Sequence, residues 1–150
     1  MGSLSLASES ARAEAGDAGC PLLKLSAWVF VGAGLGGVLR LWCSGWAARS
    51  FGETFPWGTL IVNVVGSVLI GLFATVTGPD GRVLMGSTAR QFVMLGIFGG
   101  YTTFSSFSLQ TLNLARASEW PLAAASVVGS VGLCLLGVWL GHVAGQVINR

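Results

Sequence analysis

Four long apolar segments fill nearly all of the chain beyond residue 21. They run from about Leu25 to Ala48, Thr54 to Pro79, Gln91 to Ala115 and Trp120 to Asn149. A bilayer core needs about 20 apolar residues per helix, so each segment is long enough to span. Only 9% of the chain is charged, against about 25% in soluble domains. The sequence therefore predicts an all-α membrane protein with four transmembrane helices.

The remaining parts of the chain are short or polar. Residues 1–21 are rich in serine, alanine and charge, and predict a disordered cytoplasmic tail ahead of a four-helix domain over residues 22–150. The three cysteines include no CxxC pair, so neither a disulfide framework nor a zinc site is indicated. The formal charge of +2 is too small to indicate a nucleic-acid partner.

Basic residues are unevenly divided between the two ends of the predicted bundle. The end that holds the N-terminus carries Arg12, Lys24, Arg82, Arg90 and Arg150. The other end carries Arg49 and Arg116, with Arg40 added if it reaches that surface. The excess favours a cytoplasmic N-terminus, by a modest margin.

Glycines recur at intervals of four residues in three of the segments. The pairs are Gly32 with Gly36 and Gly96 with Gly100, and the fourth segment carries Gly137, Gly141 and Gly145. Small residues at this spacing let membrane helices approach closely, so close packing explains most of these positions.

The third segment contains "GGYTTFSSF" at its middle, from Gly99 to Phe107. Glycine costs about 1 kcal/mol against alanine inside a helix, so this run favours a local break. Broken backbone at membrane depth is tolerated only where protein buries it or a polar cavity adjoins it. Two interpretations stay open: freed carbonyls that bind a cation, or a kink whose backbone groups bond to threonine hydroxyls.

Neutral polar side chains recur in the last three segments. Asn63 is followed one turn later by Ser67, and Ser126, Ser130 and Cys134 are spaced four apart. An asparagine in a membrane helix usually bonds to another helix, but it can also donate to an anion. A candidate path of neutral donors is formed by Asn63, Ser67, Ser126, Ser130, Thr111 and the serines from Ser105 to Ser108.

The motifs together resemble the small fluoride channels of the Fluc (CrcB) family. "GAGLGGVLR" ends at Arg40, "GTLIVNVVGS" contains Asn63, and "GGYTTFSSFS" contains Phe104 and Phe107. The resemblance covers the four segments and leaves out the tail. It departs at Leu41, where the family often has an aromatic residue, and at Gln110, where many members have glutamate.

The resemblance implies a fold and a set of sites. Family members form antiparallel dimers with two pores at the dimer interface, and the third helix is broken at its middle. A structural Na⁺ at the dimer centre would be held by the main-chain carbonyls of Gly99 and Thr102. Arg40 corresponds to the family's first-helix arginine. We expect it at a wide vestibule that attracts anions, with an end anchor that snorkels to the membrane surface as the alternative. The fluoride pathway would be lined by Asn63, Phe104, Phe107, Ser108, Thr111, Ser126 and Ser130, of which the last two correspond only loosely.

The expected function is passive export of cytoplasmic fluoride across the plasma membrane, which lowers fluoride toxicity, and not an enzymatic activity. The expected partners are the fluoride ion, membrane lipid, and either a second copy of the chain or a paired homologue. A small proton-coupled multidrug-type exporter is the alternative. That class needs a carboxylate within the membrane, and none of the four segments contains one. A purely structural subunit would not need the break and its hydroxyls.

Overall fold

The computed structural model describes the backbone of residues 2–150 and the side chains of residues 21–150. Four of its helices are long and apolar enough to cross a membrane: Pro21–Phe51, Trp57–Val76, Ser87–Arg116 and Trp120–Asn149. The regular elements of the described residues are all helical, so the all-α fold with four spans is confirmed. The predicted disordered tail, residues 1–21, falls almost wholly outside the described side chains and stays a prediction.

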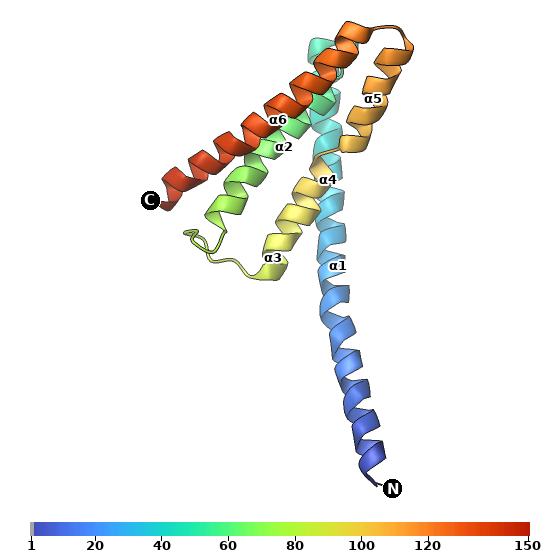
Figure 1. The fold of residues 1–150 in the computed structure, drawn as a ribbon, viewed down its shortest axis with the longest axis vertical. Coiled ribbons are helices and arrows are strands. Elements are labelled where there is room, and N and C mark those ends of the chain that lie inside the picture. Colours follow the sequence, from blue (N-terminus) through green and yellow to red (C-terminus); the bar gives the residue numbers. More distant parts are fainter. Residues whose placement is uncertain (1) are drawn as a thin grey trace.

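The spans are built from seven helical elements, coloured along the chain in Figure 1. They are α1 (Gly2–Phe51), α2 (Trp57–Val76), α3 (Ser87–Gln91), the π-helix η1 (Phe92–Phe98), α4 (Gly99–Tyr101), α5 (Phe104–Arg116) and α6 (Trp120–Asn149). Figure 1 shows α6 lying along α2, while the first part of the third span, α3 to α4, runs beside α1. The last part of that span, α5, contacts α6 instead. The fourth span has the bounds that the sequence predicts, and the first is longer at both ends.

Glycines set how closely α1 and the third span approach each other. A methyl group placed on Gly32 would lie 2.9 Å from the Cα of Gly96, and one on Gly100 would meet the carbonyl of Ala33. A methyl group on Gly36 would meet the carbonyl of Ile97 and lie 2.8 Å from the nitrogen of Tyr101. The predicted close packing at this glycine spacing is confirmed.

The α2–α6 pair is packed in the same way. A methyl group on Gly141 would meet the carbonyl of Val68, and one on Gly145 would lie 2.7 Å from the Cβ of Thr75. Gly71 on α2 faces Val138 on α6 just as closely. The glycine ridge of the fourth span therefore contacts α2.

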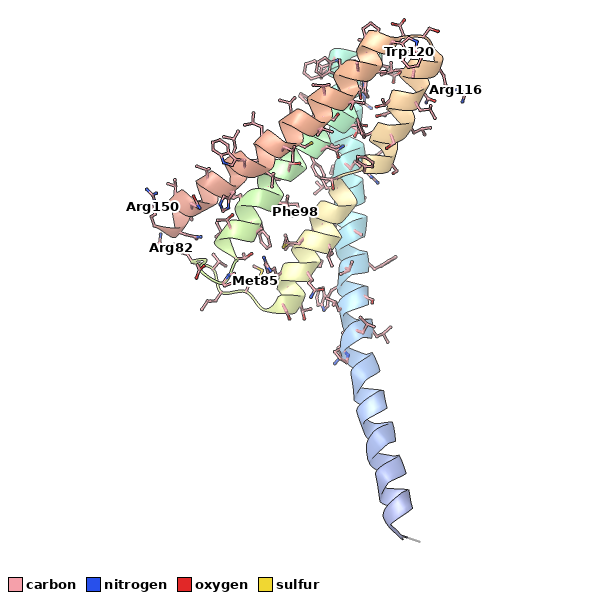
Figure 2. All side chains as sticks on the ribbon, in the orientation of Figure 1. Arg82, Met85, Phe98, Arg116, Trp120 and Arg150 are labelled. Carbon is pink, nitrogen blue, oxygen red and sulfur yellow. The ribbon has the colours of Figure 1, made fainter. Side chains whose placement is uncertain are left out.

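Polar contacts fasten one end of this pair. Asn149 on α6 donates to the carbonyl of Thr75 at 3.0 Å and accepts from the backbone N–H of Arg82 at 3.1 Å. The Arg82 guanidinium donates to the carbonyl of Ile148 at 3.0 Å. In Figure 2, Arg82 and Arg150 lie at one end of the bundle, while Arg116 and Trp120 lie at the opposite end. Arg82 and Arg150 thus lie at the opposite end of the bundle from Arg116, as the sequence predicts.

Replacing Gly36 by alanine should destabilise the protein, because backbone atoms surround the added methyl group. We expect a loss of about 1–3 kcal/mol in the free energy of unfolding, the usual cost of overpacking. Gly45 lies on the same helix with no atom within 4 Å of an added methyl group. Gly45→Ala is therefore the matched control, and equal stabilities of the two variants in a denaturant titration would contradict the packing described here.

Candidate functional site

The third span is interrupted at two threonines. Gly99, Gly100 and Tyr101 are still helical, and the backbone then becomes extended at Thr102 (φ −83°, ψ 158°) and Thr103 (φ −152°, ψ 116°). α5 begins at the next residue. The break lies in the predicted run, but at its threonines rather than at its glycines. Gly100 instead provides the close approach to Ala33 on α1.

Asn63 on α2 bonds to the backbone at the break. Its Oδ1 accepts from the Thr103 N–H at 2.8 Å, and its Nδ2 donates to the Thr103 carbonyl at 2.9 Å. One side chain thus satisfies both backbone groups of a residue that lies outside any helix. A buried polar group without a partner costs about 1–3 kcal/mol, so this pair stabilises the break. The sequence left two roles open for Asn63, a bond to another helix and donation to an anion. The first of these is present.

Thr103 itself caps the helix that follows. Its Oγ1 accepts from the backbone N–H of Ser106 at 3.2 Å, and the hydroxyl groups of Ser105 and Ser106 lie at 3.3 and 3.1 Å from it. A threonine at this position satisfies one of the donors that a helix leaves free at its start. The predicted kink with threonine bonds is therefore also present.

The break leaves two carbonyl groups without a helical donor. In an α-helix each N–H donates to the carbonyl four residues earlier. The Thr103 N–H, which would bond to Gly99 in a continuous helix, donates to Asn63 instead. The carbonyl of Thr102 has no helical donor because the backbone is extended at Thr102 and Thr103. Gly99 and Thr102 are the residues expected to hold Na⁺, and the chemistry of their oxygens fits a hard cation.

A cavity of about 340 Å³ lies where the break faces α2 and α6. Four of the residues expected along the pathway line it: Asn63, Phe104, Phe107 and Ser130. The other lining residues are Gly66, Ser67, Ile70, Thr102, Thr103, Val131, Cys134 and Leu135. The lining residues carry no formal charge, and they bring hydroxyl, amide and aromatic groups to one cavity.

The two phenylalanines lie against each other but differ in exposure. Their ring centroids are 5.3 Å apart, and the ring planes are inclined by 53°. Phe107 is 8% exposed, whereas Phe104 is 74% exposed on this single chain. The cavity is therefore open on the side of Phe104.

Three of the expected pathway residues lie outside this cavity. Ser126, only 1% exposed, shares a hydrogen bond of 3.0 Å with the hydroxyl of Thr111, which joins α6 to α5. Ser108 is exposed and donates to the carbonyl of Phe104 on its own helix at 2.9 Å. No contact with the cavity supports a pathway role for these three, and that role stays a prediction.

Arg40 lines a second cavity of about 620 Å³ on the other side of the break. Thr103 borders both cavities, and Ser106 and Gln110 border the second one with Arg40. The Oε1 of Gln110 is buried without a hydrogen-bond partner among the described residues. The vestibule role of Arg40 stays a prediction, and this cavity is the space that Arg40 lines.

Sequence reasoning did not single out Thr103, Gly66 or Cys134 as lining residues. Thr103 has a local signal, since threonine is one of the residues preferred immediately before the first turn of a helix. Gly66 has none, because a side chain there would meet the methyl group of Thr102, which the break of the third span brings against α2. Cys134 continues the stripe of Ser126 and Ser130, and its place in the cavity extends that pattern.

Asn63→Ala should destabilise the folded protein, because it leaves the N–H and the carbonyl of Thr103 without partners. We expect a loss of about 2–6 kcal/mol in the free energy of unfolding, since each of the two unpaired groups costs about 1–3 kcal/mol. Asn113, an exposed asparagine on α5, gives the control Asn113→Ala. Indistinguishable denaturation midpoints for the two variants would show that the Asn63 bonds contribute nothing.

Comparison with known proteins agrees with the fold and the motifs. The family described as "CrcB-like protein, Camphor Resistance (CrcB)" matches residues 27–142. A protein of Opitutus terrae named "Fluoride-specific ion channel FluC" is 58% identical over 127 residues, which cover 85% of this chain and 96% of the relative. A protein of the same name from Rhodospirillum rubrum is 59% identical over 125 residues, covering 82% and 97%.

The match includes every helix that surrounds the break. It spans α2, the whole third span and most of α6, so both cavities lie within it. Four long apolar helices and a family of ion channels identify a multi-pass integral protein of the plasma membrane. The chain is a member of the CrcB-like family.

Proposed function

We propose that the chain is a fluoride-selective channel through which cytoplasmic fluoride leaves passively across the plasma membrane, which lowers its toxicity. The observation that carries this proposal is the uncharged cavity at the break, in a chain that aligns with named fluoride channels over 82–85% of its length. The proposal is for a channel and not for an enzyme.

The chemistry of the cavity suits a small anion with a tightly held hydration shell. A selective pore must replace the hydrogen bonds of that shell with its own. Asn63 has two N–H groups on Nδ2, and only one of them is needed for the Thr103 carbonyl. The second can donate into the cavity, with the hydroxyl of Ser130 across from it on α6. The rings of Phe104 and Phe107 carry positive edges that can also face an anion.

The proton-coupled exporter is disfavoured by the placement of the acidic residues. Glu53, Asp80 and Glu119 all lie in the connections between the helices. None of the four membrane spans contains Asp or Glu. A carrier that exchanges protons for a substrate needs such a group within the membrane.

A Na⁺ ion held by the carbonyls of Gly99 and Thr102 is part of the proposal. Both oxygens lack a helical donor, because Asn63 takes the Thr103 N–H and the backbone is extended at Thr102 and Thr103. Among the described residues, no group of His, Cys, Asp or Glu could hold a metal ion instead. When bound, Na⁺ would offset the partial negative charge of these carbonyls at membrane depth.

We further propose that two copies, or a copy and a paired homologue, pack in opposite orientations with lipid around them. Within one chain, only 11–22% of the most apolar stretch of each span is buried. Phe104 is largely exposed, and the cavity beside it is open. A second chain over Phe104 would close the pathway and bring two copies of the break together.

Fluoride efflux from liposomes that contain only this protein tests the channel directly. We expect fluoride to leave much faster than chloride. Phe107→Ile should reduce fluoride efflux at least tenfold, since isoleucine keeps the bulk of the side chain and removes the ring edge. Ion-selective electrodes for the two anions provide the measurement.

The matched control is Phe30→Ile, because Phe30 is 80% exposed and lies on α1, away from the cavity. It should conduct like the parent. Equal efflux of the two anions through the parent would contradict the proposed function. Equal fluoride efflux through Phe107→Ile and the parent would remove Phe107 from the pathway.

Antiparallel pairing predicts that each terminus is accessible from both sides of the membrane. The native cysteines Cys20, Cys43 and Cys134 are first replaced by serine, and a single cysteine is added at one terminus. If the chain pairs with itself, an impermeant thiol reagent should label about half of these tags from outside the cell. Labelling from one side only, in a protein that conducts when purified alone, would exclude the antiparallel homodimer.

A further inference from the structure

Another cavity lies between α2 and α6, away from the break and at one end of the bundle. This end cavity has a volume of about 550 Å³, and its polar lining residues are Thr75, Asp80, His142, Gln146, Asn149 and Arg150. Figure 2 shows Arg82 and Arg150 at this end of the bundle. The proposed channel function uses none of the residues that line the end cavity.

The end cavity lies on the same face of the α2–α6 pair as the cavity at the break. On α2, Ile70 lines the cavity at the break, and Ala74, four residues later, lines the end cavity. On α6, Leu135 lines the first and His142 the second. Residues seven apart lie on one face of a helix, separated by about 10 Å along its axis. Charges act over about 10 Å in 0.1 M salt, so a charge on His142 can act on an anion at the break.

Hydrogen bonds fix which ring nitrogen of His142 carries a proton. The Thr75 hydroxyl donates its single hydrogen to the carbonyl of Gly71 at 2.8 Å. It also lies 2.8 Å from the Nδ1 of His142, where it can only accept, so Nδ1 carries the hydrogen of the neutral ring. The other ring nitrogen, Nε2, is then unprotonated and accepts from the Gln146 amide at 3.1 Å. Nε2 is therefore the atom at which the ring can take up a proton.

We propose that His142 is a proton-binding site beside the fluoride pathway: a proton taken up at Nε2 adds positive charge to the end cavity and speeds fluoride transport in acid. This inference rests on the proposed fluoride channel. In the protonated ring, Nδ1–H stays on Thr75, and the new Nε2–H faces Gln146, whose amide can turn its oxygen toward the ring. Proton uptake therefore changes the charge of the cavity without breaking the contact between α2 and α6.

The charged groups around His142 leave the balance of the end cavity to the histidine. The two charged side chains of its lining, Asp80 and Arg150, have opposite signs and cancel. Arg82, in the same connection as Asp80, donates to the carbonyl of Ile148 at 3.0 Å. The helix packed against α6 here, α2, has no titratable residue. Histidine ordinarily changes charge between about pH 5 and pH 8, so acid adds a positive charge to an otherwise balanced lining.

His142 is accessible to protons from water. Its side chain is exposed, and it lines an open cavity. α6 has 30 residues, whereas a bilayer core needs about 20, so part of the helix reaches beyond the core. Arg82 and Arg150 mark this end of the bundle as the one that meets water.

Nitrogen magnetic resonance of the ring tests the proton site directly. His142 is the only histidine, so untagged protein labelled with ¹⁵N-histidine in lipid gives the signals of one ring. At about pH 8, above the usual titration of histidine, we expect a proton on Nδ1 and none on Nε2. Thr75→Val removes the acceptor and should bring in the Nε2–H form. Thr77→Val is the control, because its hydroxyl bonds to Phe73 on its own helix, and it should leave the ring unchanged.

Fluoride efflux from liposomes tests the effect on transport. The readout is the ratio of the efflux rate at about pH 5.5 to that at about pH 8, on either side of the usual titration of histidine. Protein-free liposomes measure the leak of hydrogen fluoride, which is subtracted. We expect a ratio of at least two for the parent and near one for His142→Gln. His142→Lys is charged at both pH values, so its ratio should be near one. At the higher pH it should conduct at least twice as fast as His142→Gln.

Three results would overturn the proposal: a parent ring with its proton on Nε2 at the higher pH, equal efflux ratios for the parent and His142→Gln, or a His142→Lys variant that is no faster than His142→Gln. A parent without fluoride efflux at either pH would overturn the proposed function, and with it the effect on transport. The ring signals would still decide whether His142 is the proton site, so the two failures are distinguishable.

Discussion

The structure depends on one exchange of hydrogen bonds between Asn63 and the backbone of Thr103. Lipid offers no partner for an interrupted helix, so a span can break only where protein groups replace the missing bonds. Asn63 supplies an acceptor at 2.8 Å and a donor at 2.9 Å for the same residue. Leaving both groups unpaired would cost about 1–3 kcal/mol for each, which is a large share of the stability of so small a protein.

The same break supports both proposed ion sites. It leaves the carbonyls of Gly99 and Thr102 without helical donors, and such oxygens suit a cation. It also begins α5 at Phe104, so that hydroxyls and aromatic rings line the cavity with Asn63. Because Asn63 already donates one N–H to Thr103, it has a single N–H left for an anion. Its substitution should therefore affect the break and the pathway together.

Much of this arrangement is readable from the sequence because it is encoded locally. The length of the apolar segments predicts the four spans. The spacing of glycines by four residues predicts the close contacts of Gly32, Gly36 and Gly141. The break is predicted within its run, but its position at Thr102 and Thr103 is not. That position depends on Asn63, which lies 40 residues earlier and contacts Thr103 only after α2 packs on the third span. The bond between Thr111 and Ser126 could not be predicted from the sequence either, because the two hydroxyls meet only after α5 packs on α6.

Amide hydrogen exchange at Thr103 tests this account most directly. In the parent, the Thr103 N–H should be strongly protected, because Asn63 holds it inside the membrane domain. In Asn63→Ala, we expect its exchange rate to rise at least tenfold, while the amide of Val62, within α2, changes little. Nuclear magnetic resonance of the protein in lipid nanodiscs resolves the two amides. Equal protection of Thr103 in the parent and in Asn63→Ala would contradict the account, because the break would then persist without Asn63.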